Sequence, residues 1–258
     1  MICKRIAIAC AGLVFCGGVA LAITFGSLDG NLHPNVGGLV IEWGDPAEKV
    51  LICSGTLVAP DVFLTAAHCV SFLPTAQAWV TFDSTFDAGT STPLPGTVHM
   101  NPAYTGIPSE PGDMAIVKLD EPTTGIPLAQ LPTLGFLDQL QASKNLKNAV
   151  FTAVGYGDRR EAKEGGPHAL FPSGDTRLYA YSSFNALTNA WLRLSQNSAT
   201  GDGGTCYGDS GGPNFYAATS VIAALTVTGD RFCRATNVVY RLDTPAARQF
   251  LGEWLTLP

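Results

Sequence analysis

The octet from Cys206 to Pro213 reads Cys-Tyr-Gly-Asp-Ser-Gly-Gly-Pro and surrounds one serine with glycines. A free serine hydroxyl is a weak nucleophile, so it needs a base within hydrogen-bond reach and a third group that orients the base. Backbone N–H groups beside such a serine can stabilise the oxyanion of an acyl-transfer reaction. The octet therefore predicts acyl-transfer chemistry with Ser210 as the nucleophile.

Two other segments supply partners for this serine. His68 follows the apolar run Leu64-Thr65-Ala66-Ala67 and precedes Cys69, and a neutral imidazole is a base near physiological pH. Asp113 stands at the start of a short β-rich segment that ends at Leu119. A buried carboxylate there would fix one tautomer of the imidazole. We expect His68 to be the base and Asp113 the orienting acid.

The order of these residues along the chain excludes one competing fold. Residues 208–212 also fit the Gly-x-Ser-x-Gly turn of α/β-hydrolases, which place the acid and then the histidine after the serine. All histidines of this chain precede Ser210; they are His33, His68, His99 and His168. An α/β-hydrolase triad therefore cannot form.

In these three segments the chain resembles the trypsin and chymotrypsin family of serine proteases, with the same order of His, Asp and Ser. The resemblance covers roughly residues 23 to 256. It implies a secreted serine endopeptidase that hydrolyses peptide bonds through an acyl-enzyme intermediate. It also implies that the N–H groups of Gly208 and Ser210 form the oxyanion hole.

Short β-like runs separated by Pro and Gly clusters dominate the chain and predict an all-β protein. The resemblance refines this to two antiparallel β-barrels with the triad at their junction. We expect a signal peptide over residues 1–22, a first barrel over 23–130 and a second barrel over 131–258. The clearest predicted strands are Val36 to Trp43, Val50 to Val58, Phe63 to Ala66, Ala149 to Val154, Arg177 to Phe184 and Ser220 to Val227.

One helix is predicted at the C-terminal end of the second barrel. Asp243 or Thr244 would cap it, and Pro245 would occupy its first turn. Its apolar stripe is more typical of core packing than of a partner-binding face. The stripe consists of Ala247, Phe250, Leu251, Trp254 and Leu255.

The first 22 residues have the pattern of a secretory signal peptide. Lys4 and Arg5 precede an apolar stretch from Ile6 to Leu21, and the segment ends in the small-x-small pattern Ala20-Leu21-Ala22. An uncleaved membrane anchor is the alternative. We expect a secreted protein with no stable membrane insertion after the signal is removed.

Cleavage after Ala22 would expose Ile23 as a new N-terminus. Asp209 lies between the two residues of the expected oxyanion hole, where its charge needs a cation. The resemblance implies that the ammonium of Ile23 pairs with Asp209, so that signal removal itself would activate the protein. An ordinary mature terminus without this role is the alternative.

Cysteine usage agrees with an oxidising destination. Seven cysteines are present, and removing Cys3, Cys10 and Cys16 with the signal leaves an even number. Sequence alone leaves three pairings open. The resemblance implies Cys53 with Cys69 and Cys206 with Cys233. A metal site is the rival interpretation, but no Cys-x-x-Cys pair or spaced Cys/His cluster favours it, and we expect no metal or other cofactor.

The composition predicts a packed globular domain, with 46% hydrophobic and 14% charged residues. The formal net charge is −6, and loss of Lys4 and Arg5 would make the mature chain more acidic. An acidic balance argues against nucleic acid as a partner. We expect a monomer that acts on protein or peptide substrates and that a proteinaceous inhibitor could restrain.

Substrate preference is predicted from the position six residues before the nucleophile, which the resemblance puts at the base of the specificity pocket. That residue is Gly204, so no carboxylate is available there to bind Arg or Lys. Thr228 and Val238, whose side chains are larger than glycine, would make the pocket shallow. We expect small or medium apolar residues before the cut, unless a loop shift brings Asp202 into the pocket.

Two other functions stay open at this point. A secreted binding protein can use a protease scaffold, since fold does not fix function. An esterase can use the same triad. Outside the triad, we expect His33 to be a turn or surface residue.

Overall fold

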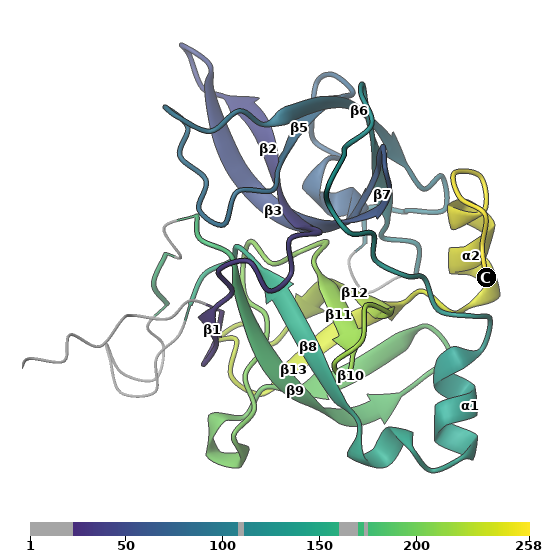
Figure 1. Cartoon of the computed structure of the whole chain (residues 1–258). Coiled ribbons are helices and arrows are strands. Elements are labelled where there is room, and N and C mark those ends of the chain that lie inside the picture. The colour runs from purple at the N-terminus through teal and green to yellow at the C-terminus, as the bar shows by residue number, and fades with distance from the viewer. Residues whose placement is uncertain (1–22, 108–110, 160–169, 173–174) are drawn as a thin grey trace, which may run out of the picture.

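The computed structural model describes residues 23–107, 111–159, 170–172 and 175–258. The expected signal peptide lies outside these residues. The described chain forms two β-barrels, one above the other in Figure 1, with the C-terminal helix packed beside them. The predicted class, two antiparallel barrels with a C-terminal helix, is confirmed.

The first barrel closes from six antiparallel strands in the order β2-β3-β4-β7-β6-β5. Its interior is filled by apolar side chains such as Leu39, Leu57 and Phe63, each fully buried. The strands are β2 (Val36–Trp43), β3 (Glu48–Ala59), β4 (Val62–Thr65), β5 (Gln77–Thr81), β6 (Leu94–Met100) and β7 (Ala115–Leu119).

The second barrel runs in the order β9-β10-β13-β12-β11-β8 and closes through the pairing of β8 with β9. A short strand, β1 (Ser27–Leu28), adds to β9 at the outside. The barrel strands are β8 (Val150–Gly155), β9 (Leu178–Leu187), β10 (Trp191–Ser195), β11 (Pro213–Tyr216), β12 (Ile222–Gly229) and β13 (Thr236–Arg241).

The two α-helices lie outside the barrels. α2 (Pro245–Leu251) begins as predicted, because Thr244 Oγ1 accepts a hydrogen bond from the N–H of Ala247 at 3.2 Å. It ends before Trp254 and Leu255, which still pack against the core. α1 (Phe136–Ala142) was not predicted; it buries Leu137 fully, and Phe136 and Leu140 pack partly buried against the same core.

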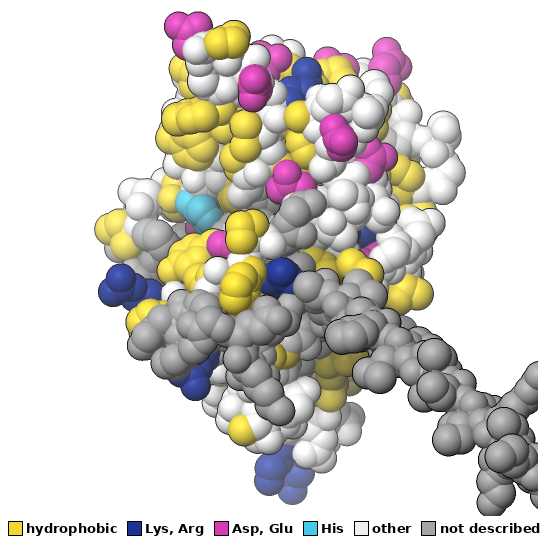
Figure 2. Space-filling view, turned by 90° about the vertical axis from the view of Figure 1, so that its left-hand side faces the viewer, with side chains coloured by type: hydrophobic (Ala, Val, Ile, Leu, Met, Phe, Trp, Pro, Cys, Tyr) yellow, Lys and Arg dark blue, Asp and Glu magenta, His cyan; other side chains and the backbone are white. Residues whose placement is uncertain are grey.

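The surface is unevenly charged. On the face in Figure 2, Asp and Glu side chains gather over the first barrel, while most Lys and Arg side chains lie lower. In the sequence, Lys49 and Lys118 are the two cationic residues between positions 23 and 130. Among the described residues, no helix combines the length and apolar character needed to cross a membrane.

A buried arginine connects the two barrels. Arg177, at the start of β9, is fully buried, and its Nε donates to Asp29 Oδ2 at 2.9 Å. Its Nη1 donates to the carbonyls of Val36 and Phe82, at 2.8 and 3.1 Å. Arg177 belongs to the second barrel, and its hydrogen bonds thus link that barrel both to the first barrel and to the N-terminal segment.

His33 belongs to the same network. It stands in a turn, as predicted, because its carbonyl accepts a hydrogen bond from the N–H of Val36 at 3.0 Å. Its N–H donates to Asp29 Oδ2 at 3.1 Å, and its ring stacks on Phe215 at 5.6 Å. Burial alone would raise the pKa of Asp29, but the hydrogen bonds from His33 and Arg177 outweigh it and leave that pKa below its ordinary value.

Removing Arg177 should therefore strongly destabilise the protein. Arg177→Met leaves Asp29 as a buried carboxylate without its guanidinium, which costs about 3 to 5 kcal/mol of unfolding free energy. Arg193→Met on β10 is the control, because Arg193 is exposed and its loss should change stability by about 0.5 kcal/mol or less. Denaturant unfolding of both variants measures this, and equal effects would contradict it.

Candidate active site

Backbone pairing brings His68 and Asp113 together. β4 and β7 are antiparallel neighbours, and Thr65 pairs with Ala115 at the end of the ladder. His68 follows β4 in a single turn of 3-10 helix, Ala67–Cys69, and Asp113 lies two residues before Ala115. Two segments far apart in the sequence therefore end at the same place.

Asp113 holds His68 by two hydrogen bonds. His68 Nδ1 lies 2.7 Å from Asp113 Oδ2, and the His68 N–H donates to Asp113 Oδ1 at 2.9 Å. The carboxylate is fully buried, while the imidazole keeps 26% of its surface exposed. A bond from Nδ1–H to the carboxylate leaves Nε2 as a free acceptor on the open side.

The loop before Asp113 is itself anchored. Asn101, at the end of β6, is buried, and its Nδ2 donates to the carbonyl of Gly112 at 3.0 Å. Gly112 adopts a φ of 107°, which favours glycine. Tyr104 lies close enough that burial, and then the charge of Asp113, raise the pKa of its hydroxyl.

Ser210 lies across a shared pocket from the first barrel. One cavity of about 270 Å³ is lined by both His68 and Ser210. Ser210 stands in the loop before β11, and its carbonyl accepts a hydrogen bond from the N–H of Ser54 on β3 at 2.9 Å. The structure thus brings the three sequence-predicted groups to one site at the junction of the barrels.

Asp209 points into the protein, as its position between two expected oxyanion donors requires. Its Oδ1 accepts from the N–H of Gly157 and its Oδ2 from the N–H of Cys206, both at 2.8 Å. Side chains on Gly155 or Gly157 would collide with it, since a Cβ on either would lie within 2.6 Å of Asp209 atoms. Burial raises the pKa of Asp209 to about 7, despite these two hydrogen bonds.

Ile23 lies near this loop. It is fully buried against Leu178 and Ala180. Its neighbour Thr24 forms an antiparallel bridge with Gly204, in which both N–H···O bonds measure 3.0 Å. In the 258-residue chain the nitrogen of Ile23 is an amide bonded to Ala22, so it carries no charge for Asp209.

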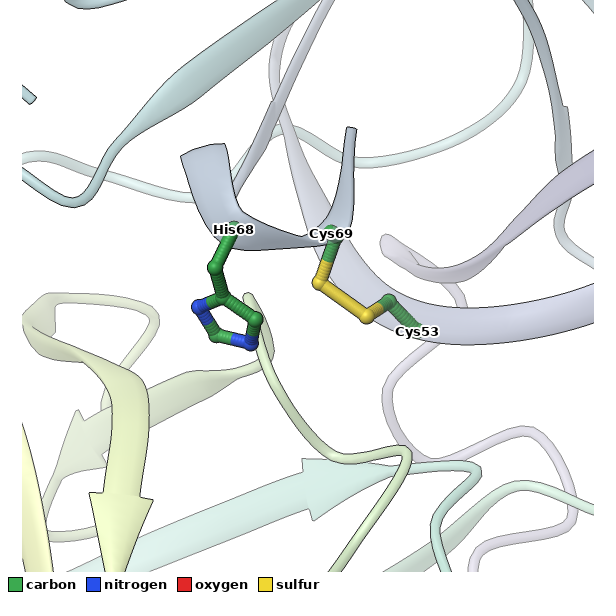
Figure 3. A group of neighbouring side chains, drawn as sticks. All are labelled: Cys53, His68 and Cys69. Carbon is green, nitrogen blue, oxygen red and sulfur yellow. A yellow bond between two sulfur atoms is a disulfide. The ribbon is translucent and has the colours of Figure 1, made fainter. Parts of the chain in front are cut away.

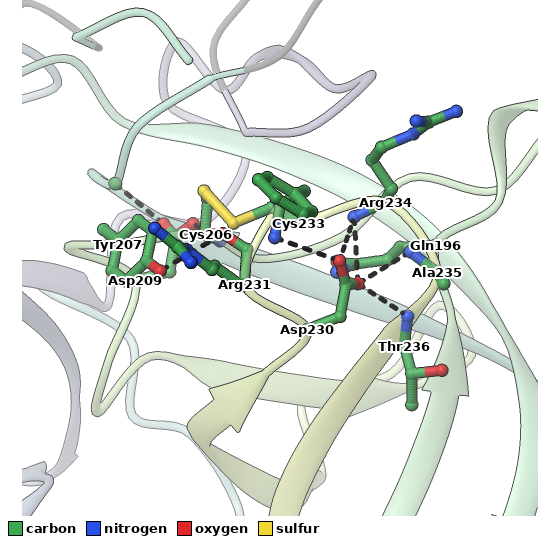
Figure 4. The surroundings of a disulfide bond; sticks show 12 residues. Gln196, Cys206, Tyr207, Asp209, Asp230, Arg231, Cys233, Arg234, Ala235 and Thr236 are labelled. Atoms are coloured by element: carbon green, nitrogen blue, oxygen red, sulfur yellow. Dashed lines mark hydrogen bonds between the residues drawn. A yellow bond between two sulfur atoms is a disulfide. The ribbon is translucent and has the colours of Figure 1, made fainter. Parts of the chain in front are cut away.

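Both disulfides have the pairing that the resemblance implied. Cys53–Cys69 ties β3 to the turn that carries His68, and Figure 3 shows the imidazole beside the two bonded sulfurs. Cys206–Cys233 ties the loop of Ser210 to the segment after β12 (Figure 4). Cys53, His68 and Cys69 lie close enough to suggest metal ligands, but the two sulfurs are bonded to each other and offer no thiolate.

The three residues predicted for the specificity pocket lie near one another. Thr228 lines the cavity, and Val238 is its partner in the pairing of β12 with β13. Gly204 precedes the cavity-lining Thr205, and a Cβ on it would lie 2.4 Å from Gln196 Oε1. Asp202 bonds instead to the hydroxyls of Ser183 and Thr200, at 2.7 and 2.8 Å.

Sequence reasoning missed one acidic residue of this cavity, Asp230. Figure 4 shows its carboxylate turned toward its own loop, where it accepts from Gln196 and from backbone N–H groups. Burial alone would raise the pKa of Asp230, but the backbone bonds from Ala235, Thr236 and Arg234 outweigh it and lower that pKa. No motif marks this residue, because its role depends on the path of the loop.

A comparison with known families decides the classification. A family model described as Trypsin matches residues 31–249, which include His68, Asp113 and Ser210. The chain belongs to the trypsin family. A trypsin-like protease of Streptomyces glaucescens is 29% identical over 170 residues, which are 63% of this chain and 58% of that protein. The aligned region thus spans less than two thirds of that relative.

Solved structures of other proteins share the trypsin-family fold. HL collagenase superposes with a TM-score of 0.64 at 17% identity, over 86% of this chain and 95% of its own. Neuropsin, a serine protease expressed in the limbic system of mouse brain, gives 0.61 at 18% identity, over 87% and 95%. At these identities the likeness shows the fold.

Proposed function

We propose that this trypsin-family chain is a secreted serine endopeptidase. In this proposal Ser210 attacks the carbonyl carbon of the scissile peptide bond while His68 Nε2 takes the hydroxyl proton. The attack forms a tetrahedral intermediate, which collapses to an acyl-enzyme when the amine leaves with that proton. Water then attacks the ester by the same route and releases the acid.

The single observation that carries this proposal is the clamp of Asp113 on His68 within a cavity that also exposes Ser210. Two bonds from one buried carboxylate fix both the backbone and the ring of the histidine. The imidazolium that forms during proton transfer would be stabilised by the same carboxylate, at 2.7 Å from Nδ1. The N–H groups of Gly208 and Ser210 would bind the oxyanion.

The specificity proposal is a preference for small or medium apolar side chains before the cut. Thr228 lines the cavity, so that wall carries a side chain larger than glycine, and its strand partner Val238 lies next to the lining residues. The carboxylate oxygens of Asp230 already accept hydrogen bonds from N–H groups of its own loop, and Asp202 is bound to Ser183 and Thr200. Neither carboxylate is free to form a basic-residue pocket.

The N-terminal proposal is that cleavage before Ile23 activates the protein. The burial of Ile23 and the bridge between Thr24 and Gly204 support it, because they hold the new terminus close to the loop of Asp209. An ammonium there would favour the charged form of a carboxyl group whose pKa burial otherwise raises to about 7.

Substitution of the triad tests the proposed reaction. Ser210→Ala should lower kcat on peptides about a million-fold, and Asp113→Asn about ten-thousand-fold through the wrong tautomer. Asp120→Asn, an exposed carboxylate at the end of β7, is the matched control and should leave kcat unchanged. Peptide and ester turnover, with labelling by a serine-directed phosphonate, provide the measurements.

Three outcomes would contradict the endopeptidase. A protein that binds ligands but resists labelling at Ser210 is a binding protein. One that hydrolyses esters and leaves peptides intact is an esterase. Full activity in Ser210→Ala would remove the nucleophile from the proposal.

A library of peptides that differ only in the residue before the cut tests the pocket. We expect kcat/KM to be at least about ten-fold higher for Ala or Val than for Arg, Lys or Phe. Thr228→Gly should widen the pocket and raise kcat/KM on the Phe peptide by about ten-fold. A preference of the wild-type protein for Arg or Lys would refute the specificity.

The N-terminal proposal predicts a pH effect on stability. In a form that keeps residues before Ile23, the folded carboxyl pKa of about 7 exceeds the ordinary 3.8. The unfolded chain therefore loses its proton first, and stability falls as pH rises from about 4 to 7, by up to roughly 4 kcal/mol. Unfolding measurements should show that this fall is absent in the form that begins at Ile23 and in Asp209→Asn.

Sequencing of the secreted protein's N-terminus completes the test. A natural start well downstream of Ile23 would contradict the proposal. So would identical pH profiles for the extended and processed forms.

A further inference from the structure

One fully buried side chain outside the expected triad contacts the loop of the nucleophile. Ser54 lies on β3 in the first barrel, next to Cys53 of the first disulfide. Its Oγ donates to the carbonyl of Gly208 at 3.0 Å, and its backbone N–H donates to the carbonyl of Ser210 at 2.9 Å. Ser54 thus binds both residues whose N–H groups form the proposed oxyanion hole.

The direction of each bond of this hydroxyl is fixed by its partners. The N–H of Tyr156 donates to Ser54 Oγ at 2.9 Å, and an amide nitrogen can only donate. The carbonyl of Gly208 can only accept, so the hydroxyl proton must point at it. Thr65 Oγ1 donates to the carbonyl of Ser54 at 2.8 Å, which holds the residue itself in place.

The bonded carbonyl belongs to a residue with little intrinsic rigidity. Gly208 has a φ of 94°, and a Cβ there would lie 2.9 Å from the Cα of Gly157. A glycine can rotate its peptide groups with little steric cost, which would turn an oxyanion donor away from the substrate. Its carbonyl belongs to the peptide group that Gly208 shares with Asp209, and this group precedes the one that carries the N–H of Ser210. A directed hydrogen bond to that carbonyl opposes rotation of this stretch of backbone.

We propose that Ser54 is a positioning residue for the oxyanion hole. Its hydroxyl and its N–H fix the carbonyls of Gly208 and Ser210, and the peptide groups that contain these carbonyls lie directly before and after the peptide group that carries the N–H of Ser210. Ser54 thus holds that N–H toward the substrate oxygen by fixing the backbone on both sides of it. This inference rests on the proposed function, because it assigns a role within that same site. Ser54 acts through Gly208 and does not itself contact the reacting atoms.

A matched control exists for the loss of a buried serine hydroxyl. Ser182 on β9 is also fully buried, and its Oγ donates to the carbonyl of Gly203 at 2.6 Å. Ser182→Ala removes the same type of bond from the same segment, but five residues before Gly208. Both variants should lose stability, so a difference in catalysis between them isolates the role of Ser54.

The experiment compares Ser54→Ala, Ser54→Thr and Ser182→Ala on one peptide substrate. We expect Ser54→Ala to lower kcat about ten-fold with KM within about two-fold, less than the loss of an oxyanion donor itself. Ser182→Ala should keep kcat within about two-fold. Ser54→Thr retains the hydroxyl and should keep kcat within about three-fold.

A tetrahedral adduct supplies a readout that a purely structural role would not move. A peptidyl trifluoromethyl ketone forms a hemiketal oxyanion with the serine, whereas the corresponding peptide amide binds without one. Affinity for the ketone should fall in Ser54→Ala by the same factor as kcat/KM. Affinity for the amide should stay within about two-fold of wild type.

The inference is overturned if Ser54→Ala keeps wild-type kcat and ketone affinity, or if Ser182→Ala loses as much of both. If Ser54→Ala does not fold, Ser54→Thr carries the test, and a ten-fold loss of ketone affinity with its hydroxyl retained overturns the inference. Failure of the proposed function is distinct, because the wild-type protein would then resist labelling at Ser210 or leave peptides uncleaved.

Discussion

The burial of Asp209 is the constraint on which the nucleophile loop depends. Its carboxylate packs against Gly155 and Gly157, where a side chain on either glycine would collide with it, and the N–H groups of Gly157 and Cys206 bind it. In the proposed function, the residues on either side of Asp209 are the nucleophile and the two N–H donors of the oxyanion hole, so the position of Asp209 sets theirs. The glycines of β8 and its following turn are therefore part of the structure that holds this loop.

Motifs allowed the main chemical groups to be predicted. His68 and Ser210 stand in short segments whose neighbouring residues are typical of the trypsin family. The order of His, Asp and Ser along the chain excluded the α/β-hydrolase fold. The β-strands were predicted where apolar runs are bounded by Pro and Gly, and β2 matches its predicted range. α1 was missed because its seven residues place only Phe136, Leu137 and Leu140 on the core, which is too short a pattern to identify a helix.

What could not be predicted depends on distance in three dimensions. In the sequence, Ser54 is one small residue within a predicted strand. The proposed positioning role of its hydroxyl depends on Gly208, 154 positions away in the sequence, lying beside it. Arg and Asp side chains are mostly found on protein surfaces, so a sequence predicts Arg177 and Asp29 to be exposed. Both are buried here, because the guanidinium and the carboxylate form an ion pair. Asp230 lines the cavity without any motif, since the turn after β12 directs its carboxylate back toward the backbone.

Each disulfide links two segments of the same barrel, and neither disulfide links one barrel to the other. Cys53–Cys69 closes within the first barrel and Cys206–Cys233 within the second, and these are all the cysteines after residue 22. A cut in the peptide that joins the barrels, for example near the left-handed Gly125, would leave two chains without a covalent link. Association of such fragments would depend on the apolar core that both barrels share, together with the Arg177 network and the bonds from Ser54, so recovery of the native fold after mixing would report on docking between the halves.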